Sequence, residues 1–173
     1  MAAGLHWRHT MKFLHTMGAI GLMGAMACFI VMLYAAPSAP LSAASLPQYA
    51  TLRAAMAEIA RWLFLPSMAA TLISGLIAIA INRGFHNAGW AWVKLLSGVL
   101  IFEWGFVGIL GPLQNEAEQA AKALAGGADA AALLATLGSE TAAQRMSLWA
   151  LFAVATFNVV FGVWRPRLTS LRD

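Results

Sequence analysis

The sequence predicts an all-α membrane protein in which four spanning helices pack as a bundle. Hydrophobic residues make up 61% of its 173 residues and charged residues only 10%, whereas a soluble domain carries about 25% charged residues. Four stretches come close to the roughly 20 apolar residues that a helix needs to cross a bilayer. They are residues 13–36, 62–81, 90–113 and 146–164. We therefore expect one multi-pass domain over residues 1–173, in the cell membrane.

The composition also limits the partners. The net charge is +4, but the basic residues stand singly at the ends of apolar runs, which is typical of membrane proteins and not of nucleic-acid-binding ones. Cys28 is the only cysteine in the sequence, which excludes an internal disulfide and a CxxC metal site. We expect a lipid bilayer around the chain and no nucleic acid as partner.

The first span is rich in small residues, and Gly18, Gly21 and Gly24 permit a neighbouring helix to approach closely. Glycines are also spaced along the third span, so a homo-oligomer or a complex with another membrane protein is conceivable. After a Pro/Ser/Ala-rich loop, the stretch YATLRAAMAEIARWLFLP predicts an amphipathic helical lead into the second span. The stretch NRGFHNAG predicts a tight turn into the third span.

Residues 114–145 form the longest connection, between the third and fourth spans. Its two alanine-rich pieces, NEAEQAAKALA and DAAALLATL, predict helices, and Gly126 and Gly127 separate them. This polar, acidic segment outside the membrane is suited to cap the bundle or to dock a partner.

The distribution of Lys and Arg predicts the orientation. Short cytoplasmic segments of membrane proteins carry an excess of basic residues. An even number of spans puts both termini on one side, and we expect that side to be the cytoplasm. The count is six on that side (Arg8, Lys12, Arg83, Arg165, Arg167, Arg172) against four on the other (Arg53, Arg61, Lys122, Arg145).

Three ionisable residues lie inside predicted spans. His15 and Lys94 are both within roughly 3 to 6 Å of the start of their spans, and the predicted topology places both near the cytoplasmic face. Glu103 lies about 20 Å along its helix from Trp90, close to the middle of the membrane. Nine residues separate Lys94 from Glu103, so the two point to opposite faces of one helix.

A mid-membrane carboxylate must be paired or protonated. Thr71 and Asn158 fall at a similar depth, and we therefore expect Thr71, Glu103 and Asn158 to form a polar layer in the bundle interior. Other interpretations stay open: Lys94 can extend to the interface, His15 can be an interfacial residue, and Glu103 can form a structural hydrogen bond. The methionines of the first span are expected in an apolar core, with metal binding as the alternative.

Four segments together resemble one superfamily. MKFLHTMGAIGLMG is similar to the first helix of the HemJ-type protoporphyrinogen oxidases and their CopD-like relatives, and MAEIARWLFLPSMAATLISGLIAI is similar to the second. GWAWVKLLSGVLIF is similar to the third helix, and VVFGVWRPRL to the end of the fourth. FEWGFVGILGPLQNE also resembles a related group of predicted integral membrane proteins of undefined role.

This resemblance implies haem b as cofactor, with His15 as ligand of the haem iron and Lys94 as a catalytic residue that orients propionates or substrate carboxylates. It implies oxidation of a porphyrinogen with electrons passed to quinone, and Glu103 would relay protons or hydrogen-bond in the core. Only one histidine lies within a span, which excludes bis-histidine ligation. The alternatives are a non-enzymatic membrane subunit that docks a partner through residues 114–145, and a transporter or metal-handling protein that uses the methionines and Glu103.

Overall fold

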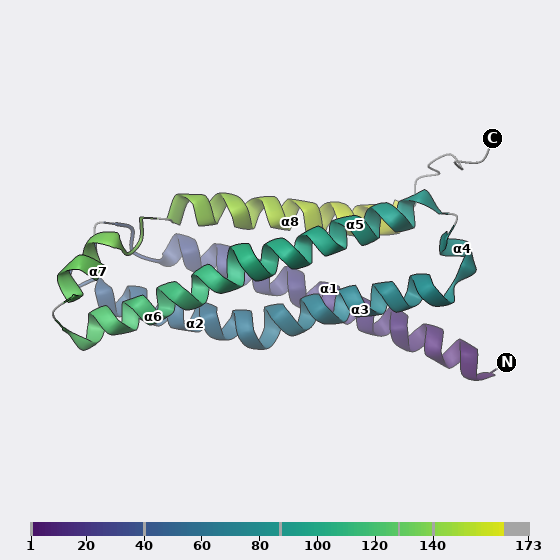
Figure 1. The fold of residues 1–173 in the computed structure, drawn as a ribbon, viewed down its shortest axis with the longest axis horizontal. Helices are drawn as coiled ribbons and strands as arrows, with labels where there is room; N and C mark the ends of the chain where they lie inside the picture. The colour runs from purple at the N-terminus through teal and green to yellow at the C-terminus, as the bar shows by residue number, and fades with distance from the viewer. Residues whose placement is uncertain (1, 40, 87, 128, 140, 165–173) are drawn as a thin grey trace.

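The computed structural model describes residues 2–39, 41–86, 88–127, 129–139 and 141–164. In this part of the chain every regular element is a helix, and four rods of helix lie side by side along one long axis (Figure 1). The predicted all-α bundle is confirmed. The rods are α1 (Ala2–Ala35), α2–η1–α3 (Leu46–Ile59, Ala60–Phe64, Leu65–Ile81), α5–η2–α6 (Gly89–Trp104, Gly105–Leu110, Gly111–Ala125) and α8 (Thr141–Trp164).

Two short helices mark the ends of the bundle. α4 (Arg83–His86) lies where the predicted tight turn joins the second rod to the third, and α7 (Ala130–Thr136) lies at the opposite end (Figure 1). We name these the α4 end and the α7 end. The first residues of α1 and the last of α8 are at the α4 end. Arg165, Arg167, Arg172 and the side chain of Arg83, all used in the charge count, lie outside the described residues.

Each rod contains a helix that is long and apolar enough to cross a membrane, so the chain is a membrane protein. These helices are Trp7–Ala35, Leu46–Ile81, Gly89–Ala125 and Ala142–Trp164. The second and third have 36 and 37 residues, or about 54 Å at 1.5 Å per residue, against a hydrocarbon thickness of about 30 Å. The charged residues of these two rods are concentrated in α2 and α6, at the α7 end, so we expect the excess to project beyond the bilayer there.

The projecting parts form a small core of their own. The predicted helical lead is confirmed as α2, and the predicted alanine-rich helices are confirmed as α6 and α7. Gly126 ends α6 with a φ of 71°, a left-handed conformation that glycine adopts without strain. The buried side chains are contributed by the loop after α1, by α2, by α6 and by the segment that follows α7: Leu41, Leu46, Tyr49, Ala50, Ala120, Ala123 and Leu137.

Both long rods contain a π-helical stretch, η1 in the second and η2 in the third. Each is followed by a proline near the start of the next helix, Pro66 or Pro112. A proline ring clashes with the carbonyl four residues earlier, and a wider turn relieves this clash. The two stretches meet in the bundle, because a Cβ on Gly105 would lie 2.9 Å from Cζ of Phe64.

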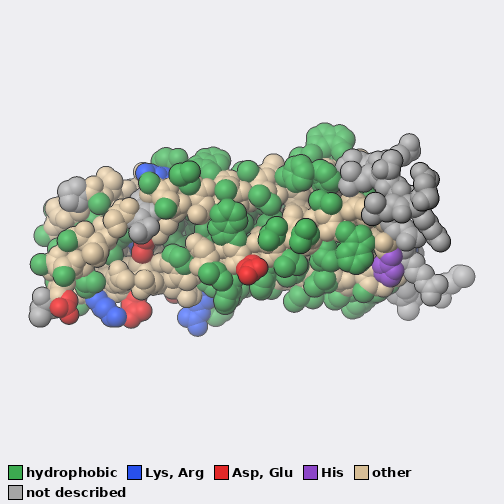
Figure 2. Space-filling view, turned by 45° about the horizontal axis from the view of Figure 1, so that its top comes forward, with side chains coloured by type: hydrophobic (Ala, Val, Ile, Leu, Met, Phe, Trp, Pro, Cys, Tyr) green, Lys and Arg blue, Asp and Glu red, His purple; other side chains and the backbone are tan. Residues whose placement is uncertain are grey.

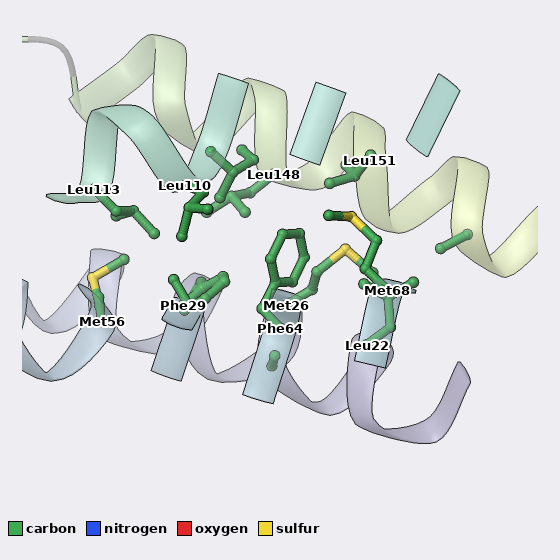
Figure 3. Packing of buried hydrophobic residues seen from close by; sticks show 14 of the residues in the cluster. Leu22, Met26, Phe29, Met56, Phe64, Met68, Leu110, Leu113, Leu148 and Leu151 are labelled. Atoms are coloured by element: carbon green, nitrogen blue, oxygen red, sulfur yellow. The ribbon is translucent and has the colours of Figure 1, made fainter. Parts of the chain in front are cut away.

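The apolar core occupies the middle of the bundle and its α7 side. Figure 3 shows Met26 and Phe29 of α1 beside Phe64 of η1, pointing toward leucines of the third rod and α8. The half toward the α4 end is packed differently. Among residues 7–20, 69–82, 84–86, 88–100 and 156–164, the structure buries only Met11, Gly18, Ser74 and Ala91. Few large side chains are therefore fully buried in that half.

Candidate cofactor site at the α4 end

His15 is held against α3 through one nitrogen of its ring. Its Nδ1 atom lies 2.9 Å from the carbonyl oxygen of Thr71 and 3.3 Å from Oγ of Ser74. The ring also lies over Gly75, where a Cβ would be 3.4 Å from Cε1 of the imidazole. α1 comes this close to α3 because Gly18 has no side chain: a Cβ there would lie 2.4 Å from Oγ1 of Thr71.

This contact determines which nitrogen of His15 carries the proton. A carbonyl oxygen can only accept a hydrogen bond, so Nδ1 must be the donor to Thr71. In the neutral ring, Nε2 then keeps its lone pair. Ligand histidines in metal and haem sites are oriented by such a bond from the second nitrogen. In the half-buried neutral His15 side chain, Nε2 is thus the nitrogen with acceptor character.

Lys94 lies in the same part of the bundle. A Cβ on Gly162 of α8 would be 2.6 Å from Nζ of Lys94, so the ammonium group lies directly against α8. His15 and Lys94 therefore lie in the same half of the bundle, His15 against α3 and Lys94 against α8.

A further hydrogen bond joins α5 to α8 one helical turn from Lys94. The amide Nδ2 of Asn158 donates to Oγ of Ser97 over 2.7 Å, and the Ser97 hydroxyl is also within 2.7 Å of the carbonyl oxygen of Val93. Ser74 is only 3% exposed and bonds to carbonyls of its own helix. In this half of the bundle, polar and small residues thus lie at the contacts between the helices. Ser74 and Ser97 were not among the predicted site residues.

The predicted polar layer of Thr71, Glu103 and Asn158 is not formed. The Thr71 hydroxyl donates to the carbonyl of Ser67 over 2.8 Å, and Asn158 bonds to Ser97. Glu103 is exposed on the outside of the bundle. Residues at the same depth on neighbouring helices can point to different sides of those helices. The prediction used depth alone. An interior proton relay at Glu103 is therefore wrong.

A buried charge that the sequence analysis missed lies at the α7 end. The side chain of Arg53, on α2, is 0% exposed, and its Nε lies 2.9 Å from Oε2 of Glu116 on α6. Its Nη1 donates to Oε1 of Gln144 on α8 over 2.9 Å. Its position between Tyr49, Ala50 and Met56 on one face of α2 was a usable signal, because that spacing marks the buried face. On the face in Figure 2, the acidic and basic side chains are concentrated toward this end, and hydrophobic ones cover the middle.

Among the described residues, no group of three or more His, Cys, Asp or Glu side chains is placed to hold a metal ion. The methionines of the first span divide between environments: Met26 is fully buried in the apolar core, whereas Met17 is 49% exposed.

No protein family model matches the chain, and comparisons with curated proteins and with solved structures give no match. Function is therefore inferred from the geometry of the chain itself.

Proposed function

We propose that this protein binds haem b at the α4 end, where His15 would hold the iron through Nε2. The observation that supports this most directly is the 2.9 Å contact between His15 Nδ1 and the Thr71 carbonyl oxygen. It fixes the ring orientation and leaves on Nε2 the lone pair that haem iron requires.

Two features of the surroundings support a partly anionic ligand beside His15. Gly75 presents no side chain beside the imidazole. The Lys94 ammonium, near the membrane surface, is positioned to neutralise propionates. Haem b would supply one-electron redox chemistry at this position.

The resemblance to HemJ-type proteins extends this proposal to a substrate. In this extension His15 would hold the cofactor and Lys94 would bind the carboxylates of a porphyrinogen, whose electrons would be passed to a quinone. The α4 end would then face the cytoplasm together with both termini, as the excess of basic residues predicts.

The test is the visible spectrum of detergent-purified protein, expressed with added haem precursor and recorded oxidised and then dithionite-reduced. We expect a Soret band with reducible α and β bands, lost or strongly weakened in His15→Ala. His86→Ala is the matched control, because this histidine also bonds a carbonyl, that of Ile79, through one ring nitrogen at 2.9 Å but is exposed on α4. A haem-free wild type, or equal haem loss in both variants, would contradict the proposal.

A non-enzymatic membrane subunit is the second candidate. It is favoured by the way residues 114–145 cap the bundle: α6 and the segment after α7 bury apolar side chains against α2, whereas Glu118 and Lys122 remain exposed as an ion pair of 2.7 Å. A haem-free protein that co-purifies in mild detergent with a stoichiometric partner, and loses it when Glu118 and Lys122 are replaced by alanine, would favour this candidate.

A further inference from the structure

Glu103 is an acidic residue within a membrane-crossing helix, and its side chain is exposed. Its side chain is exposed on the third rod, with Leu100 one turn before it and Val107 one turn after it exposed at 54% and 68%. The residue lies near the middle of the membrane-crossing helix, about 20 Å from Trp90 and about 15 Å from Leu113. Among the described residues, none forms a hydrogen bond or ion pair with its carboxyl group. A carboxyl group is thus directed toward lipid at the depth where this costs most.

The exposed residues around Glu103 form a continuous line along the rod. Their spacing alternates between three and four residues, the pattern of a seam between two packed helices. A regular repeat would reach the buried Leu110, but the wide turn η2 shifts the line by one residue to the exposed Gly111. The seam consists of Val93, Leu96, Leu100, Glu103, Val107, Gly111 and Gln114, all exposed.

We propose that this seam is the interface between two copies of the chain, packed in parallel about a twofold axis. In such a contact each seam residue meets its own counterpart. Each leucine or valine of the seam contacts the same residue of the other copy. Gly111 has no side chain, which allows the two rods to approach closely. The two Glu103 carboxyl groups then share one proton, so that the protonated carboxyl donates and the carboxylate accepts.

A second copy fits better than the alternatives. Exposed apolar residues alone indicate only lipid, but lipid chains cannot satisfy a carboxyl group. A different partner helix would need a cation or donor at one specific depth. A second copy of the chain, packed in parallel, has its own Glu103 carboxyl group at the same depth. A single polar residue in an apolar seam fixes register and oligomeric state. This inference is independent of haem binding.

The test is disulfide cross-linking of the full chain in lipid vesicles. All variants carry Cys28→Ala, because the natural cysteine is exposed. Val107→Cys places a thiol in the seam, and Val31→Cys on α1 is the matched control, since the two valines are 68% and 67% exposed. Under mild oxidation we expect a homodimer from Val107→Cys and none from Val31→Cys. Equal cross-linking of both, or of neither, would overturn the proposal.

The role of Glu103 is tested in the Val107→Cys background by dilution of the protein in lipid. Glu103→Leu removes the shared proton and should lower the dimer association constant about tenfold, equivalent to about 1.4 kcal/mol. Glu103→Gln retains donors and acceptors and should stay within about threefold of the parent. Unchanged association in Glu103→Leu, or a cross-link to a different protein, would show that two copies do not meet through Glu103.

Discussion

The guanidinium of Arg53 and the carboxylate of Glu116 form a buried ion pair, with Nε 2.9 Å from Oε2. Polar side chains of α2 and α8 also bond to the pair. Tyr49 donates to Oε2 of Glu116 over 3.2 Å, and the Gln144 amide bonds to both Arg53 and Glu116. The Tyr49 ring also lies 4.9 Å from the guanidinium carbon, a distance typical of cation–π contacts. This network ties α2, α6 and α8 together at the α7 end.

Removing one partner of this pair should be costly. Glu116→Ala leaves the fully buried Arg53 without its counter-charge, and we expect the free energy of unfolding to fall by about 3–5 kcal/mol. The measurement is equilibrium unfolding in bicelles. Glu118→Ala is the matched control, because it removes an acid two residues later whose partner Lys122 is exposed, and its stability should match the wild type. Similar losses in both variants would mean that the burial of Arg53 is unimportant.

The close contact of α1 with α3 should depend on one glycine and not on its neighbour. A Cβ on Gly18 would lie 2.4 Å from Oγ1 of Thr71 and 2.8 Å from the carbonyl oxygen of Ser67, whereas a Cβ on Gly24 meets nothing within 4 Å. The backbone oxygen cannot move aside as a side chain can. We expect Gly18→Ala to lower the free energy of unfolding by about 1–3 kcal/mol, and Gly24→Ala to leave it nearly unchanged. Two equally stable variants would contradict the close approach.

Substitutions of Gly75, which lies beside the His15 ring, give a third prediction. A methyl group on Gly75 would be 3.4 Å from Cε1 of His15, an ordinary contact, so Gly75→Ala should retain the wild-type haem content. Gly75→Leu adds atoms that the ring cannot avoid and should displace His15, with haem content at least tenfold lower and a shifted Soret band. The measurement is the reduced spectrum at equal protein concentration. A normal spectrum in Gly75→Leu would place the haem away from His15.

Much of the fold could be predicted from hydropathy and helix signals alone. Apolar runs of membrane length located all four rods, and Gly126 correctly marked the end of α6. The helices before the second span and after the third were predicted, but not that they continue those spans without a break, because a hydropathy pattern ends where the apolar residues end. Residues 46–59 and 114–125 thus continue the spans well beyond the bilayer.

For the candidate site residues, the depth along the helix could be predicted, but the side of the helix on which each residue lies could not. His15 and Lys94 are at one end of the bundle because both lie near the start of a span. Glu103 was expected inside because of its depth, but Gly105 packs against Phe64, and Glu103, two residues earlier and so about 200° around the helix, faces outward. Which side of a helix faces inward depends on contacts between helices, which a single sequence does not specify.

The hydrogen bond from Asn158 to Ser97 permits a test of how strongly α5 and α8 are joined beside the proposed cofactor site. The 2.7 Å contact joins two half-buried residues, and hydrogen bonds between membrane helices contribute about 0.6 kcal/mol on average and at most about 1.7. In a double-mutant cycle of Ser97→Ala and Asn158→Ala, we expect a coupling free energy within that range. Thr156→Ala is the control for Asn158→Ala, because its hydroxyl bonds only the carbonyl of Phe152 on the same helix, and it should show no coupling to Ser97→Ala. Additive effects of Ser97→Ala and Asn158→Ala would mean that the two helices are held at the α4 end by packing alone.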